Sequence, residues 1–148
     1  MATQVRTDID QLLADSLKEL AAKRPMEKIT IKEITDKAGV IRPTFYNHFQ
    51  DKFELLEWII RTELLEPILP LVRSGMVTEA MVLLFSSIER DKAFYSHVVK
   101  LEGAVTFHDV AQKCVREMLL ELINEQMSGK TPKHKWLSPE IIASYYAQ

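Results

Sequence analysis

Residues 31–52 carry the clearest structural signal in this sequence and read IKEITDKAGVIRPTFYNHFQDK. The segment opens with a capping box, because the hydroxyl of Thr30 can accept a hydrogen bond from the amide of Glu33, whose carboxylate can reach back to Thr30. Gly39 suits the left-handed position that follows a helix. The pattern therefore predicts a short helix that begins after Thr30 and ends at Gly39.

A second short helix is expected at residues 42–49. Pro43 falls in its first turn, which tolerates a proline because the missing amide hydrogen would have no partner there. Val40 is apolar and would plug the turn between the two helices, and Asp51 can cap a longer helix that follows. Two short helices joined by a glycine turn follow the helix-turn-helix plan, whose second helix enters the major groove of DNA. The motif spans residues 31–50.

The second helix carries polar side chains whose chemistry suits DNA. Arg42 can bind a guanine edge through two hydrogen bonds, or a phosphate, and Asn47 either reads an adenine edge or faces solvent. Thr44 can meet a thymine methyl group or a phosphate. Phosphate oxygens are the expected partners of Tyr46, His48 and Lys52.

The same stretch resembles the head of the tetracycline-repressor (TetR) family. That family has a capped helix, then Ala-Gly-Val, then a run in which Thr, several aromatic residues and Lys fall at fixed offsets. These features stand here at residues 30–34, 38–40 and 44–52, and the resemblance covers about residues 13–56. Residues 41–43 depart from it, because Ile-Arg-Pro replaces the Ser-x-Gly or Ser-x-Ala of many members. The operator sequence of a family member therefore does not transfer to this chain.

The resemblance implies a DNA-facing surface and a packed interior for the head. Phe45 and Phe49 match positions that pack the head in the family. The positions that commonly face DNA match Thr30, Lys32, Arg42, Pro43, Thr44, Tyr46, His48 and Lys52.

Composition and periodicity indicate an all-α protein. Only 4 glycines and 6 prolines occur among 148 residues, and 47% of the residues are apolar, which leaves little room for many tight turns. Apolar residues recur at helical spacing at about residues 7–23, 51–66, 75–89, 92–101, 106–127 and 138–148. We expect a three-helix helix-turn-helix head at residues 1–52 and a helical ligand-binding and dimerisation body at residues 53–148.

Two helix boundaries in the body carry local signals. Pro67 and Pro70 are expected to end the helix that starts after Asp51. Thr106 and Asp109 form a second expected capping pair, at the start of a long helix.

The body resembles, less specifically, the short C-terminal body of Firmicute-type members, which include dihydroxyacetone-kinase regulators. The resemblance lies in Phe94-Tyr95, in residues 101–103 and in the loop at residues 128–137. In the family, two C-terminal helices of each subunit build a four-helix dimer interface. Only the first of them begins here, and it is cut off at Gln148. We therefore expect a homodimer and a natural protein that continues beyond this sequence.

The family also implies a ligand cavity among the body helices, and a largely apolar pocket fits the composition. Residues of the types concerned more commonly pack a core. The candidates for the pocket are Met81, Phe85, Phe94, Tyr95, Phe107, Cys114 and Met118. The basic loop at residues 130–135 is expected to be solvated, with an anion or a partner protein as its alternative occupant.

Bulk properties argue against several other classes of protein. The net charge of −2 argues mildly against a protein that coats nucleic acid without specificity. Cys114 is the only cysteine, which excludes an internal disulfide, and its spacing from His97 and His108 is not that of metal ligands. We expect no metal and no cofactor. No apolar stretch is long enough to span a membrane, so a cytoplasmic location is expected.

The function expected from these observations is that of a sequence-specific DNA-binding transcriptional regulator. We expect a repressor that binds a palindromic operator as a dimer and responds to a small-molecule effector. One alternative keeps the head and lets the body dock a protein coregulator, through Phe94, Tyr95 or the basic loop. A remote alternative is a small helical enzyme that uses Cys114 or a histidine, although no nucleophile paired with a base supports it.

Overall fold

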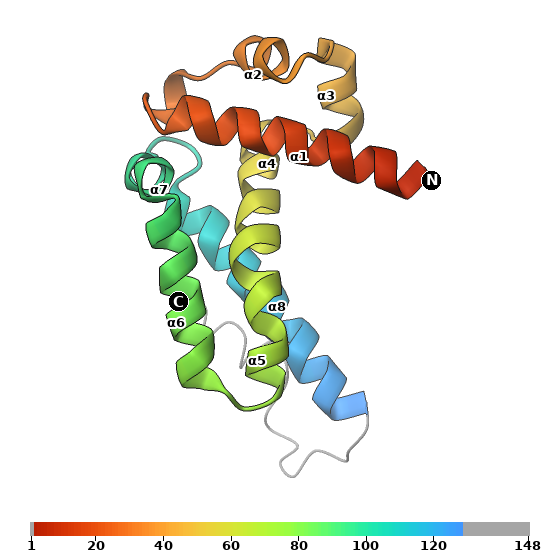
Figure 1. The fold of residues 1–148 in the computed structure, drawn as a ribbon, viewed down its shortest axis with the longest axis vertical. Coiled ribbons are helices and arrows are strands. Elements are labelled where there is room, and N and C mark those ends of the chain that lie inside the picture. Colours follow the sequence, from red (N-terminus) through yellow and green to blue (C-terminus); the bar gives the residue numbers. More distant parts are fainter. Residues whose placement is uncertain (1, 129–148) are drawn as a thin grey trace.

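The computed structural model describes residues 2–128, with side chains from residue 8 onward, and within that range every regular element is helical. Figure 1 shows α1, α2 and α3 gathered at one end of the molecule, while α4 leads away from them into a body that contains α6 and α8. The all-α architecture with a helix-turn-helix head is therefore confirmed. The helix expected at residues 138–148 and the basic loop at residues 130–135 lie outside the described residues.

The head consists of α1 (Ala2–Ala21), the 3-10 turn η1 (Met26–Lys28), α2 (Ile31–Ala38) and α3 (Arg42–His48). Both short helices stand where the sequence predicts them. The apolar stripe of α1 packs against α2, α3 and α4. Residues with no exposed surface form the centre of this packing, and they include Leu13, Leu17, Ile34, Phe45 and Leu55.

A continuous helical rod leads from the head into the body. It comprises α4 (Lys52–Ile59), the π-helical segment η2 (Ile60–Leu65), the 3-10 turn η3 (Glu66–Ile68) and α5 (Leu69–Arg73). The helix that starts after Asp51 ends at Leu65, shortly before Pro67, as expected, although the chain continues in helical turns through η3 and α5. Each proline occupies the first turn of a new helical segment, where its missing amide hydrogen costs no bond. The rod as a whole ends at Gly75, which has a φ of 75°.

The rest of the described body consists of α6 (Val77–Arg90), α7 (Lys92–Val98) and α8 (Phe107–Ser128). The capping pair at the start of α8 is present: the amide of Asp109 donates to the hydroxyl of Thr106 at 3.1 Å, and Asp109 Oδ2 accepts from the amide of Thr106 at 3.0 Å. Buried side chains of head, rod and body form one hydrophobic cluster. The boundary after residue 52 stays a prediction.

Candidate nucleic-acid interface

The start of α2 is held by a capping box that the sequence predicts. The hydroxyl of Thr30 accepts from the amide of Glu33 at 3.1 Å, and the Glu33 carboxylate accepts from the amide of Thr30 at 2.9 Å. Arg24 donates to the same carboxylate at 2.6 Å. The Arg24 hydrogen bond, with that from the Thr30 amide, lowers the pKa of Glu33 to about 2. The exposed Thr30 side chain is therefore engaged in the cap.

The turn between α2 and α3 sets the angle at which the second helix leaves the first. Gly39 has a φ of 75°, in the left-handed region that favours glycine. The amide of Val40 donates to the carbonyl of Thr35 at 3.1 Å, and the amide of Gly39 to that of Asp36 at 3.4 Å. Both bonds belong to the Schellman motif, which closes a helix on a left-handed residue.

Two aromatic side chains fix one face of α3 against the head. Phe45 is fully buried, Phe49 is nearly so, and their ring centroids lie 5.9 Å apart. Phe49 also packs edge-on against Trp58 of α4, at 6.3 Å. The packing role that the resemblance implies for Phe45 and Phe49 matches this arrangement, and the opposite face of α3 is turned outward.

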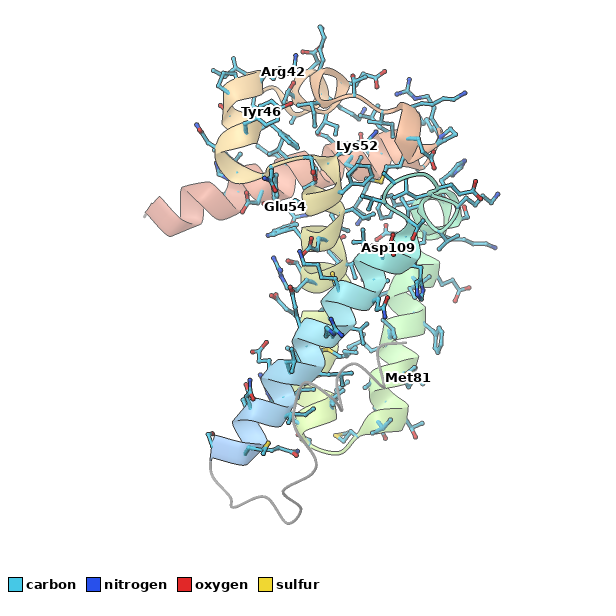
Figure 2. The ribbon with its side chains drawn as sticks, turned by 180° about the vertical axis from the view of Figure 1, so that it is seen from behind. Arg42, Tyr46, Lys52, Glu54, Met81 and Asp109 are labelled. Carbon is cyan, nitrogen blue, oxygen red and sulfur yellow. The ribbon has the colours of Figure 1, made fainter. Side chains whose placement is uncertain are left out.

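The outward face of α3 presents most of the side chains that the sequence analysis selected for DNA. Arg42 and Tyr46 are both exposed, and the guanidinium carbon of Arg42 lies 5.8 Å from the centroid of the Tyr46 ring (Figure 2). This cation–π contact holds the arginine over the helix without using any of its hydrogen-bond donors. Pro43 and Asn47 are exposed, and Thr44 is half-buried.

Lys32 adds a cation to the same end of the molecule from α2. Its side chain is 77% exposed and pairs with Asp36, with Nζ and Oδ2 2.6 Å apart. An exposed pair one helical turn apart is screened by water and contributes little to stability. A phosphate can therefore draw the ammonium away from Asp36 at little cost.

His48 lies between α3 and α1 instead of on the outward face. Its Nδ1 is 2.7 Å from Oδ1 of Asp10, and both side chains are mostly buried. The imidazole therefore ties the reading helix to α1. This position departs from the phosphate contact expected from the sequence, because the ring points toward α1.

Lys52, which the sequence led us to expect at a DNA phosphate, is engaged inside the head in this structure. Its ammonium group donates to three backbone carbonyls, those of Met26 at 2.8 Å, Glu27 at 3.0 Å and Ile29 at 2.9 Å. An ammonium group has three donors, and all three are used inside the head. Burial lowers the pKa of Lys52, although the charges of Glu27 and Glu33 oppose that shift. No local sequence signal marks this role, because the carbonyls stand 23 to 26 positions earlier in the chain.

The pocket residues expected in the body do not meet in one cavity among the described residues. Tyr95 lines a cavity of about 360 Å³ beside α1, whereas Cys114 and Met118 line another of about 350 Å³ beside η2. Phe94 is buried and borders a third hollow, and Phe107 is half-buried. Met81 and Phe85 lie on the outer side of α6, where Phe85 is 61% exposed (Figure 2 labels Met81).

Cys114 has the surroundings of a core thiol. It is buried, its Sγ donates to the carbonyl of Glu57 at 3.6 Å, and burial raises its pKa to about 12. A thiol held in this protonated state is a poor nucleophile. Among residues 2–128, no three His, Cys, Asp or Glu side chains are grouped so that they could hold a metal ion. In that same range, no helix has the length and apolarity needed to cross a bilayer.

Comparison with known proteins extends the resemblance noted in the head. Residues 13–59 match the family model described as bacterial regulatory proteins of the tetR family. Over 92 residues the chain is 26% identical to the HTH-type dhaKLM operon transcriptional activator DhaS of Lactococcus lactis subsp. lactis (strain IL1403). That alignment covers 62% of this chain and 49% of the relative, so the chain spans about half the length of the curated relative that it matches.

A solved structure, that of the dihydroxyacetone kinase operon activator DhaS, superposes with a TM-score of 0.59 at 23% identity. The superposition covers 94% of this chain and 77% of that one. It shows that the two proteins share a fold. The family model describes regulatory proteins, and both relatives are by name operon activators.

Proposed function

Residues 13–59 of this chain are a tetR-family domain, and from this premise we propose that the chain is a transcriptional regulator that reads an operator with α3. One observation carries the proposal. The helix is anchored by buried Phe45 and Phe49 on one side, while Arg42, Tyr46 and Asn47 point outward on the other. A rigid helix with an outward polar face is what major-groove reading requires.

Within this proposal the outward side chains divide into two roles. Arg42 reads a guanine edge, because its planar guanidinium group matches the two acceptors of that base, and Asn47 reads an adjacent base. Lys32 and Tyr46 bind phosphates and so set the register of the head on the duplex. Thr30, Pro43 and Thr44 complete the contact surface at the starts of the two helices.

We extend the proposal to a dimer that binds a palindromic operator. Two heads placed about 34–36 Å apart meet successive major grooves on one side of the duplex. Residues 53–148 form the sensing and pairing part, and a signal acts by favouring one spacing of the heads over another. The sequence led us to expect repression, whereas the curated relative is by name an operon activator, which favours activation. Expression from a promoter–reporter fusion, with and without the chain, decides the direction.

The experiment that tests the reading helix compares Arg42→Ala with Lys92→Ala. The probe is a duplex selected from a random-sequence library by the wild-type chain. Arg42→Ala should weaken binding to this duplex by about 1–3 kcal/mol and relax the preference at one position. Lys92→Ala removes one positive charge at the exposed start of α7 and should leave binding unchanged. A wild-type chain that enriches no sequence would overturn the proposal.

In a second candidate function, the body binds a protein coregulator in place of a metabolite. The observation that favours it is the outer face of α6, where Val77, Val82 and Phe85 are each more than half exposed. Phe94 and Tyr95, considered for this role from the sequence, are buried and unsuited to it. Val82→Lys with Phe85→Lys should then abolish regulation of a reporter in cells while purified protein keeps its DNA affinity. Retained regulation would dismiss this candidate.

A further inference from the structure

A cavity of about 360 Å³ lies where the head meets the body. Its walls come from α1, η2, the end of α6 and the start of α7. The volume falls within the roughly 300–1,000 Å³ of small-molecule sites. The polar residues around it are Lys18, Glu63, Ser87, Arg90, Asp91 and Tyr95.

Two buried oxygen atoms of this cavity lack hydrogen-bond partners among the described residues. Tyr95 is 4% exposed, and its phenol oxygen has no partner. Packing edge-on against Phe94, with ring centroids 4.9 Å apart, holds the Tyr95 ring in place. On Glu63, Oε1 accepts from Lys18 at 3.1 Å, whereas Oε2 lies 3.0 Å from the same ammonium group but accepts no hydrogen bond. Buried polar groups are almost always satisfied, so the phenol oxygen of Tyr95 marks a place for a polar occupant. Glu63 Oε2 is held only by its ion pair with Lys18 and can accept a further hydrogen bond.

The charges around the cavity cancel. Lys18 binds Asp91 at 2.8 Å as well as Glu63, and these bonds outweigh the effect of burial and raise the pKa of Lys18. Arg90 donates to the hydroxyl of Ser87 at 3.3 Å. Two cations and two carboxylates leave no net charge for a charged ligand to complement.

A neighbouring hollow shares Lys18, Arg90 and Asp91 with this cavity and adds the carboxylates of Asp15 and Glu19, so carboxylates outnumber cations in its lining. A phosphorylated compound near the cavity would meet this excess of negative charge, which disfavours its binding.

We propose that this cavity is the effector site and that it binds a small neutral polyhydroxylated compound. The hydroxyl groups of a polyol can both donate to Glu63 Oε2 and accept from the Tyr95 phenol, whereas a carboxylate cannot donate and an ammonium group cannot accept. The inference deepens the proposed function and rests on it. The ligand lies between α1 and the π-helical segment η2. There it competes with Lys18 of α1 for the Glu63 carboxylate of η2, and so weakens the ion pair that joins the head to the rod. Any such effect is reciprocal, because bound DNA must change the affinity for the ligand by the same factor.

The test titrates the chain with glycerol, erythritol and xylitol, and with glycerol 3-phosphate as the charged comparison, using ligand-observed NMR. We expect at least one polyol to bind and the phosphate ester to bind at least ten-fold more weakly. Tyr95→Phe should weaken polyol binding at least ten-fold. If Tyr95→Phe does not fold, Glu63→Gln replaces it and should weaken polyol binding to the same extent. Ser96→Ala, which removes an exposed hydroxyl from the same helix, should change nothing.

The same samples are titrated with the selected duplex. A saturating polyol should change the duplex affinity of the wild-type chain at least three-fold and leave that of Tyr95→Phe unchanged. Failure of all three polyols to bind, preference for the phosphate ester, or full binding by Tyr95→Phe would overturn the inference. A duplex affinity that does not change when a polyol is bound would also overturn the inference. A chain that binds its duplex but no polyol loses only this inference, whereas one that enriches no duplex loses the proposed function.

Discussion

Replacing Lys52 with methionine should weaken folding and spare the phosphate contacts of the DNA complex. Methionine keeps an unbranched apolar stem of similar length and removes only the ammonium group. That group donates to the carbonyls of Met26, Glu27 and Ile29 at 2.8 to 3.0 Å, and so closes the segment between α1 and α2. The variant therefore separates an internal role for Lys52 from the phosphate contact that the sequence suggested.

The size of the effect follows from the three bonds. A hydrogen bond to a charged group contributes about 1.5–3 kcal/mol. The three bonds share one charge and do not add, and the carbonyl of Met26 also accepts from the amide of Ile29 at 3.1 Å. The ammonium group is only half-buried, so water replaces part of what is lost. We expect the free energy of unfolding to fall by about 2–4 kcal/mol, a large share of the 5–15 kcal/mol typical of a folded domain.

Urea unfolding followed by circular dichroism measures this loss, and Lys32→Met is the matched control. Lys32 is exposed and paired only within its own helix, so its replacement should leave the urea midpoint nearly unchanged. In DNA titrations Lys32→Met should have the larger effect and Lys52→Met the smaller one. Lys32→Met should reduce the salt dependence of binding by about 0.9 in the slope of log K against log salt, and Lys52→Met should not. Lys52→Met with wild-type stability and a reduced slope would refute the internal role.

Three further outcomes follow from the structure. Asp10→Asn should lower the free energy of unfolding by about 1 kcal/mol, since it weakens the bond to His48 between α1 and α3, and an unchanged urea midpoint would contradict that tie. Because Arg24 holds the pKa of Glu33 at about 2, below its ordinary 4.5, the Glu33 carboxylate stabilises the fold above about pH 5, and this stabilisation is lost as the pH falls toward 2. Glu33→Gln should therefore show a shallower loss of stability across that range in urea titrations, and a loss as steep as that of the wild type would speak against the pair. Cys114, with a pKa near 12, should react with an aromatic disulfide reagent at pH 8 only as fast as the protein opens, and the rate of a free thiol in native protein would show that burial does not protect it.

Features that depend on neighbours in the chain were predictable from the sequence. The capping box at Thr30, the left-handed Gly39 and the cap of α4 by Asp51, which accepts from the amide of Glu54 at 2.8 Å, all involve residues within five positions of one another. The shared inward side of Phe45 and Phe49 follows from the same local geometry, because residues four positions apart lie on one face of a helix. Backbone hydrogen bonds of caps and turns form between residues a few positions apart, so the local sequence is enough to predict them.

Features that join distant parts of the chain depended on packing. Lys52 meets carbonyls more than twenty positions away, and His48 meets Asp10 across 38 positions. Lys18 bridges to Asp91 across 73 positions, which builds the cavity between head and body. A long polar side chain has the same chemistry on a surface, against DNA or under a loop. Its partner is set by which helices the hydrophobic core brings together, and that arrangement exists only once the chain has folded.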